Sequence, residues 1–154
     1  MELLTESKTL SGDLIALRRT LHAVPEVGLT LPVTQRVLLE ELGRLEHLDL
    51  EISTGDAVSS VTAVLRGGRH TGDGPVVLLR ADMDGLPVIE LTGEPFAPGP
   101  DSAHHSAMHA CGHDLHVSGL VGAVRLLGAH RDELPGDVVF MFQPGERAST
   151  ARVT

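Results

Sequence analysis

The sequence predicts an α/β fold that forms the N-terminal part of a mixed, mainly parallel sheet with helices on both faces. Three observations predict it. Two segments with helical spacing come first, strand-like segments follow between residues 48 and 82, and a strand–helix–strand order closes the chain. A crossover helix between two strands of one sheet indicates a parallel βαβ unit with a right-handed connection.

The first two elements are predicted as helices over residues 11–23 and about 32–46. Apolar residues recur at helical spacing in both, and Pro32 lies in the first turn of the second helix, where proline is favoured. The Pro25–Gly28 stretch separates them. The chain therefore begins with a helical pair.

The remaining elements follow from a change of period. Residues 48–53 and 60–67 alternate like half-buried strands, whereas the continuously apolar run 76–79 predicts a strand covered on both faces. Helical spacing returns over residues 114–130, and residues 138–142 form another apolar strand. The long segment 83–111 is irregular, and long loops in compact domains are often functional.

Composition excludes several classes of protein. The net charge is −9 over 154 residues and no basic cluster occurs, so a nucleic acid is not an expected partner. No apolar run reaches membrane-spanning length, and the first residues do not resemble a signal peptide. The single cysteine forms no internal disulfide, which favours a cytoplasmic location.

The stretch "MHACGHDLH", residues 108–116, concentrates metal-binding side chains where the third predicted helix begins. Asp82 and Asp84 lie just past one predicted strand, and Glu146 lies just past another. Because sites in open α/β sheets lie beyond the carboxyl ends of strands, we expect these acids to meet the histidine-rich stretch at one edge.

These residue types suit a divalent metal site. Cys111 and His113 are two positions apart and would project to the same side of an extended segment. One of Asp82 and Asp84 could bind metal while the other orients a ligand histidine, and Glu146 could act as general base. Two alternatives stay open: Cys111 is a nucleophile with a lowered pKa, or the stretch is an ordinary polar loop.

Four blocks of sequence resemble the M20 peptidase family, in its amidohydrolase branch of hippurate hydrolase-like and N-acetyl-diaminopimelate deacetylase-like enzymes. They are "ALRRTLHAVPEVG" (16–28), "LLRADMDGLPV" (78–88), "MHACGHDLHVSGLVGAVRLL" (108–127) and "GDVVFMFQPGE" (136–146). The resemblance implies a zinc-exopeptidase-like catalytic domain with two divalent ions, which could be zinc, manganese, cobalt or nickel. It implies a small N-acyl amino acid as substrate, and the lack of a membrane-spanning apolar run makes a membrane partner unexpected.

The resemblance also implies residue roles. Cys111 would be the bridging thiolate and His113 a terminal metal ligand, with Asp84 as the acid behind the metal centre and Glu146 as the general base. The family's block continues with a glutamate that binds metal, but Arg147 stands here. A guanidinium offers no lone pair, and each like-charge pair costs roughly 4 kcal/mol at ~4 Å in an effective dielectric near 20.

Residues 1–146 are therefore interpreted as the N-terminal portion of the catalytic domain, and residues 147–154 as an aberrant tail. Our hypothesis for this tail is a single-nucleotide deletion that shifts the reading frame after Glu146. Later ligands and the family's dimerising domain would then be absent, so we expect this chain to bind fewer ions, or bind them weakly, and to have little activity. The alternative is a non-catalytic remnant or metal-binding fragment.

Overall fold

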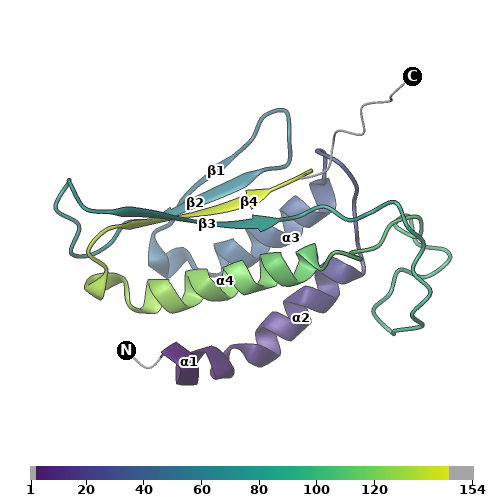
Figure 1. The fold of residues 1–154 in the computed structure, drawn as a ribbon, viewed down its shortest axis with the longest axis horizontal. Helices are drawn as coiled ribbons and strands as arrows, with labels where there is room; N and C mark the ends of the chain where they lie inside the picture. Colours follow the sequence, from purple (N-terminus) through teal and green to yellow (C-terminus); the bar gives the residue numbers. More distant parts are fainter. Residues whose placement is uncertain (1–2, 146–154) are drawn as a thin grey trace.

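The computed structural model describes residues 3–145, which form helices on one layer and a four-stranded sheet on the other (Figure 1). Within these residues, four helical elements precede the first strand of the sheet, and loops or turns separate them. The elements in chain order are α1 Leu3–Thr9, α2 Ser11–His22, α3 Pro32–Gly43, η1 Glu46–Leu48, β1 Glu51–Thr54, β2 Val61–Leu65, β3 Val76–Asp82, α4 His113–Ala129, η2 Arg131–Glu133 and β4 Asp137–Gln143. The predicted helices and strands are confirmed, and α1 is an addition that the sequence reasoning missed.

The sheet is mixed, as predicted, with the strand order β1-β2-β4-β3. Strand β3 pairs with β4 in parallel, from Val76 opposite Asp137 to Asp82 opposite Gln143. The β1–β2 and β2–β4 pairs are antiparallel. The expectation of a mainly parallel sheet is thus corrected, because the short β1–β2 connection makes a hairpin and β4 inserts between β2 and β3.

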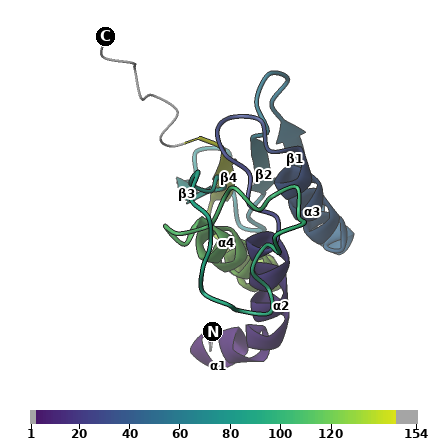
Figure 2. The ribbon, with the colours of Figure 1, turned by 90° about the vertical axis from the view of Figure 1, so that its right-hand side faces the viewer.

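All the described helices lie on one face of the sheet. Figure 1 shows α4, α3 and α2 below the strands, and the turned view in Figure 2 shows the same arrangement along the sheet. The prediction of helices on both faces is therefore wrong for residues 3–145. The crossover from β3 to β4 requires only one helix, α4, and the two preceding helices pack beside it on the same face.

The core lies between the sheet and these helices. Strand β4 presents Phe140 and Phe142 to it, both fully buried, and β2 presents Val61 and Ala63 beside them. Opposite them, α4 contributes Val117, Val121 and Val124, each with 0% exposure. Aliphatic side chains supply most of this core because the chain has no tryptophan or tyrosine and few phenylalanines.

Strand β3 differs from its neighbours because it forms an edge of the described sheet. Val76, Val77 and Leu78 are 63%, 51% and 52% exposed. The prediction that residues 76–79 are covered on both faces is therefore wrong. A continuous apolar run predicts a strand that is buried on both faces. Among the described residues, no helix or strand covers the outer side of β3. No helix among the described residues is long and apolar enough to span a membrane.

Candidate metal centre

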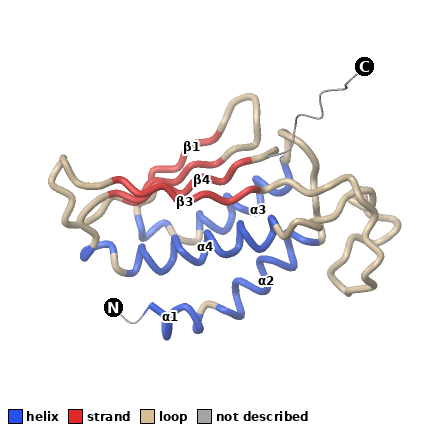
Figure 3. The backbone as a smooth tube through the Cα atoms, viewed as in Figure 1, coloured by secondary structure: helices blue, strands red, loops and turns tan. Residues whose placement is uncertain are grey.

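The carboxyl end of β3 and the first turn of α4 lie at the same end of the molecule. A long loop joins them and projects beyond the sheet (Figure 3). A two-stranded bridge between Leu86 and Met108 closes the base of this loop, with both backbone hydrogen bonds formed. Gly85 fits there because a Cβ would lie only 3.1 Å from Pro25. The sheet and the bridge thus fix where the polar residues of both segments lie.

Three side chains at this end form a group that suits a metal ion. One ligand atom from each of Asp82, His113 and His116 lies within 4.8 Å of the others. Asp82 ends β3, whereas the histidines are three residues apart on α4 and so share one side of the helix. A carboxylate and two imidazoles are a donor set that zinc and similar ions accept, so the residues present fit a divalent ion.

His113 is held in a defined orientation by Asp84. Its Nδ1 atom lies 2.9 Å from the backbone oxygen of Asp84 and 3.1 Å from the carboxylate oxygen Oδ1. Since both partners accept, Nδ1 carries the proton, and that tautomer places the lone pair on Nε2. Both residues are buried, at 6% and 5% exposure. This is the arrangement in which a carboxylate orients a metal-binding histidine.

Two of the predicted site residues are not brought into this group. Cys111 is a free, exposed cysteine in the turn before α4 and is not a member of the Asp82–His113–His116 group. Its predicted role as a metal ligand stays a prediction. Glu146 and Arg147 lie outside the described residues, so the predicted general base and the predicted repulsion also remain predictions.

His109 lies with its ring centre 6.2 Å from that of His22 and is 4% exposed. Neither ring nitrogen has a hydrogen-bond partner among the described residues. Burial lowers the pKa of His109 to about 4, so the ring is neutral at pH 7. A buried imidazole with both nitrogens unsatisfied is uncommon in proteins, and here it lies two residues before Cys111.

A buried polar network anchors the loop to the helices. His22 places Nδ1 2.7 Å from Oδ2 of Asp114 and Nε2 3.1 Å from Oε2 of Glu90. The side chains of Asp114 and Glu90 are 0% and 2% exposed. His22 ends α2, Asp114 lies in the first turn of α4 and Glu90 belongs to the loop. The network therefore joins the three segments directly behind His113.

Sequence reasoning missed the importance of His116, although the residue lies in the stretch that drew attention to the site. The i, i+3 spacing of His113 and His116 on a predicted helix would have placed them on one side. The network of His22, Glu90 and Asp114 gave no comparable pattern, because its members come from three distant segments.

Known proteins are similar to this chain in sequence and in fold. The model of Peptidase family M20/M25/M40 matches residues 78–152, which include every residue of the Asp82–His113–His116 group. The chain is 42% identical over 144 residues to an N-acetylcysteine deacetylase of Bacillus subtilis, covering 90% of this chain and 34% of that protein. It is 41% identical over 134 residues to an N-acetyldiaminopimelate deacetylase of Halalkalibacterium halodurans, covering 87% and 33%.

The fold gives the same result. A solved Bacillus subtilis protein, described as a dinuclear metal binding peptidase from the M20 family, superposes with a TM-score of 0.73 at 38% identity. The match covers 89% of this chain and 36% of that one. The described fold is thus similar to part of the catalytic domain of an M20 peptidase. The resemblance to the M20 peptidase family seen in the sequence is confirmed, and the chain spans about a third of the length of the curated relatives it matches.

Proposed function

We propose that this chain provides a divalent-metal site of an enzyme that hydrolyses the amide bond of N-acyl amino acids. The observation that supports it most is the orientation of His113 by Asp84, next to Asp82 and His116. The relatives named as deacetylases of N-acetylcysteine and N-acetyldiaminopimelate support the substrate class. A free, exposed Cys111 is in keeping with the expected cytoplasmic location.

Each residue has a distinct role in this proposal. His113 and His116 would hold the ion with Asp82, and Cys111 would join them as the resemblance implies. A bound divalent ion supplies Lewis-acid polarisation of the amide carbonyl and a lowered pKa for water. Asp84 keeps Nδ1 of His113 protonated, and Glu146 takes a proton from the attacking water.

A concave surface lies beside the group and suits a small substrate. A groove of about 340 Å³ runs between β3 and α4, and His116 is one of its walls. Leu79, Leu120 and Ala123 make its apolar lining. A volume of this order lies in the range of small-molecule sites, so we assign the substrate's apolar part to it.

The second candidate is a non-catalytic remnant that binds metal without turnover. The chain spans about a third of the length of the related deacetylases. Arg147 favours this second candidate, since the resemblance places a metal-binding glutamate at that position. For this chain alone we therefore expect one weakly held ion or none, and little hydrolysis of an N-acyl amino acid.

Metal analysis after equilibrium dialysis against zinc tests the site. We expect His113→Ala to abolish the binding seen with the natural chain, and His47→Ala, an exposed histidine elsewhere, to leave it unchanged. Ligand-observed NMR with N-acetylcysteine then separates the two candidates. Binding that requires both zinc and His113 supports the hydrolase. Zinc binding with no recognition of the N-acyl amino acid supports the remnant, and zinc binding that survives His113→Ala refutes the site.

A further inference from the structure

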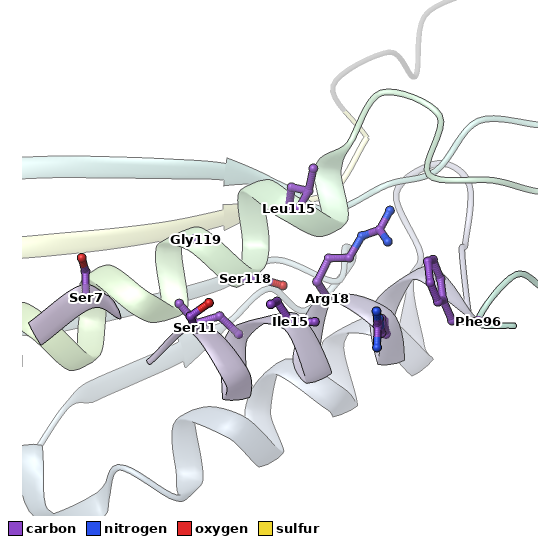
Figure 4. A pocket seen from close by; sticks show the side chains of 10 residues that line it. Ser7, Ser11, Ile15, Arg18, Phe96, Leu115, Ser118 and Gly119 are labelled. Atoms are coloured by element: carbon purple, nitrogen blue, oxygen red, sulfur yellow. The ribbon is translucent and has the colours of Figure 1, made fainter. Parts of the chain in front are cut away.

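A second concave surface lies on the other side of α4 from the candidate metal centre. It is a groove of about 570 Å³ between α1–α2 and the first turns of α4, and Phe96 of the long loop borders it (Figure 4). This volume is in the range of small-molecule sites. In the metal group, α4 contributes His113 and His116, whereas the groove takes Leu115 and Ser118 from the same turns. At 100° per residue these pairs lie on different sides of the helix.

One wall of the groove is apolar and open to solvent. Ile15 of α2 is 49% exposed and Leu115 of α4 is 58% exposed, with Leu14 between the helices. Gly119 leaves the floor empty, because a Cβ there would meet no atom within 4 Å. Two large aliphatic side chains facing one hollow have no covering element among the described residues. A ligand with an apolar chain would bury both.

The opposite end of the groove is cationic. The guanidinium of Arg18 lies 4.9 Å from the centre of the Phe96 ring, and that of Arg19 lies 5.2 Å from it. Arg18 is already paired with buried Asp114, with Nε 2.8 Å from Oδ2. Arg19 has no acidic partner among residues 3–145. The exposed guanidinium of Arg19 thus lies beside an aromatic ring without an ion-pair partner among the described residues, in a chain whose net charge is −9.

This pairing of an apolar wall with one guanidinium defines the chemistry of the ligand. The guanidinium of Arg19 lies over the Phe96 ring, and a guanidinium can bind a carboxylate through two parallel hydrogen bonds. Ser11 also lines the groove, whereas the hydroxyls of Ser7 and Ser118 already donate to the backbone oxygens of Leu4 and Asp114. A neutral ligand would fill the apolar wall but leave Arg19 uncompensated.

We propose that this groove binds a small amphipathic carboxylate, with its apolar chain against Ile15 and Leu115 and its carboxylate on Arg19. The site is separate from the metal centre and does not depend on hydrolase activity. Arg18 links the two sites, since it borders the groove and also pairs with Asp114, the neighbour of His113.

Octanoate is a suitable probe, and isothermal titration of the whole chain measures its binding. We expect octanol, which has a chain of the same length and no charge, to bind at least tenfold more weakly. Arg19→Gln should weaken octanoate binding by about tenfold or more, because a charge-assisted contact is lost. Arg36→Gln is the matched control, since Arg36 is an exposed arginine on α3.

A second variant tests the apolar wall independently. Ile15→Asp places a negative charge beside the chain of the ligand and should abolish octanoate binding. Ile52→Asp makes the same change at another exposed isoleucine, on β1, and should leave binding intact. Equal affinity for octanoate and octanol, no binding at millimolar octanoate, or an Arg19→Gln variant with natural affinity would each overturn the proposal.

Discussion

The two faces of the sheet have similar residues and opposite environments. On the helix-covered face, Phe140 and Phe142 of β4 are fully buried against α4. On the open face and edge, Val76 and Leu78 of β3 are more than half exposed, although they are as apolar as the core. The difference shows that the described residues cover the helix-facing side of the sheet and leave the other side of β3 exposed. We call these the covered half and the open half of the fold. The candidate metal centre lies where the two halves meet, because α4 belongs to the covered half and Asp82 ends the exposed strand β3.

The largest expected effect comes from deleting a side chain on the covered face. Phe140→Ala should lower the free energy of unfolding by about 3–5 kcal/mol, since it removes apolar contact and leaves a cavity. Small domains are stable by only ~5–15 kcal/mol, so much of this stability would be lost. Urea denaturation measures it.

The same substitution on the open face provides the matched contrast. Leu78→Ala should change the free energy of unfolding by less than about 0.5 kcal/mol, because Leu78 is already 52% exposed. Similar losses of unfolding free energy for Phe140→Ala and Leu78→Ala would show that the open face is covered in solution. The two faces would then not differ in environment.

The next effect concerns the site that joins the two halves. Asp84→Asn should weaken zinc binding by roughly 10–100-fold, because the carboxylate no longer orients His113. Competition with a chromogenic chelator measures the affinity. Asp56→Asn, in the exposed turn after β1, is the control and should bind as the natural chain does. An unchanged affinity in Asp84→Asn would mean that His113 needs no such support.

A smaller effect is expected from the exposed strand. Unpaired apolar edge strands promote association between chains, so we expect the protein to self-associate. Leu78→Lys should shift sedimentation profiles toward monomer, whereas Leu4→Lys, at a 74% exposed position on α1, should not. A natural chain that sediments as a single monomer and melts cooperatively would contradict this expectation.

The smallest effect is a dependence of stability on acid pH. A hydrogen bond from Arg66 lowers the pKa of Asp137, with a further contribution from the backbone N–H of Gly67. Because the folded pKa lies below the unfolded value, this stabilisation is complete above about pH 4 and is lost as pH falls through the folded pKa. Asp137→Asn should lose stability at neutral pH, and its difference from the natural chain should shrink in acid. A difference that stays constant down to the acid range would assign the loss to packing instead.

Much of the fold could be predicted because its elements have local patterns. Helical spacing located α2, α3 and α4, and the apolar run 138–142 located β4. Strand coverage could not be predicted, because residues 76–79 look the same whether or not another element covers them. The order β1-β2-β4-β3 likewise depends on contacts between distant segments.

The candidate site was predictable in part for the same reason. Asp82, Asp84 and His113 lie in short stretches whose position relative to strands and helix could be inferred. To predict that His116 lies beside His113, the side of the helix on which each residue lies was needed as well. His109 and the His22–Glu90–Asp114 network depend on burial and on contacts across the fold, which composition does not encode.

X-ray absorption at the zinc edge, on the natural chain and on His113→Ala, tests the central claim most directly. The account predicts imidazole scattering with oxygen or nitrogen at roughly 2.0–2.2 Å in the natural chain, and loss of the imidazole component in the variant. Additional sulfur at about 2.3 Å would identify Cys111 as a further ligand. A zinc spectrum without imidazole, or one that is the same in both proteins, would contradict a metal centre at the end of β3.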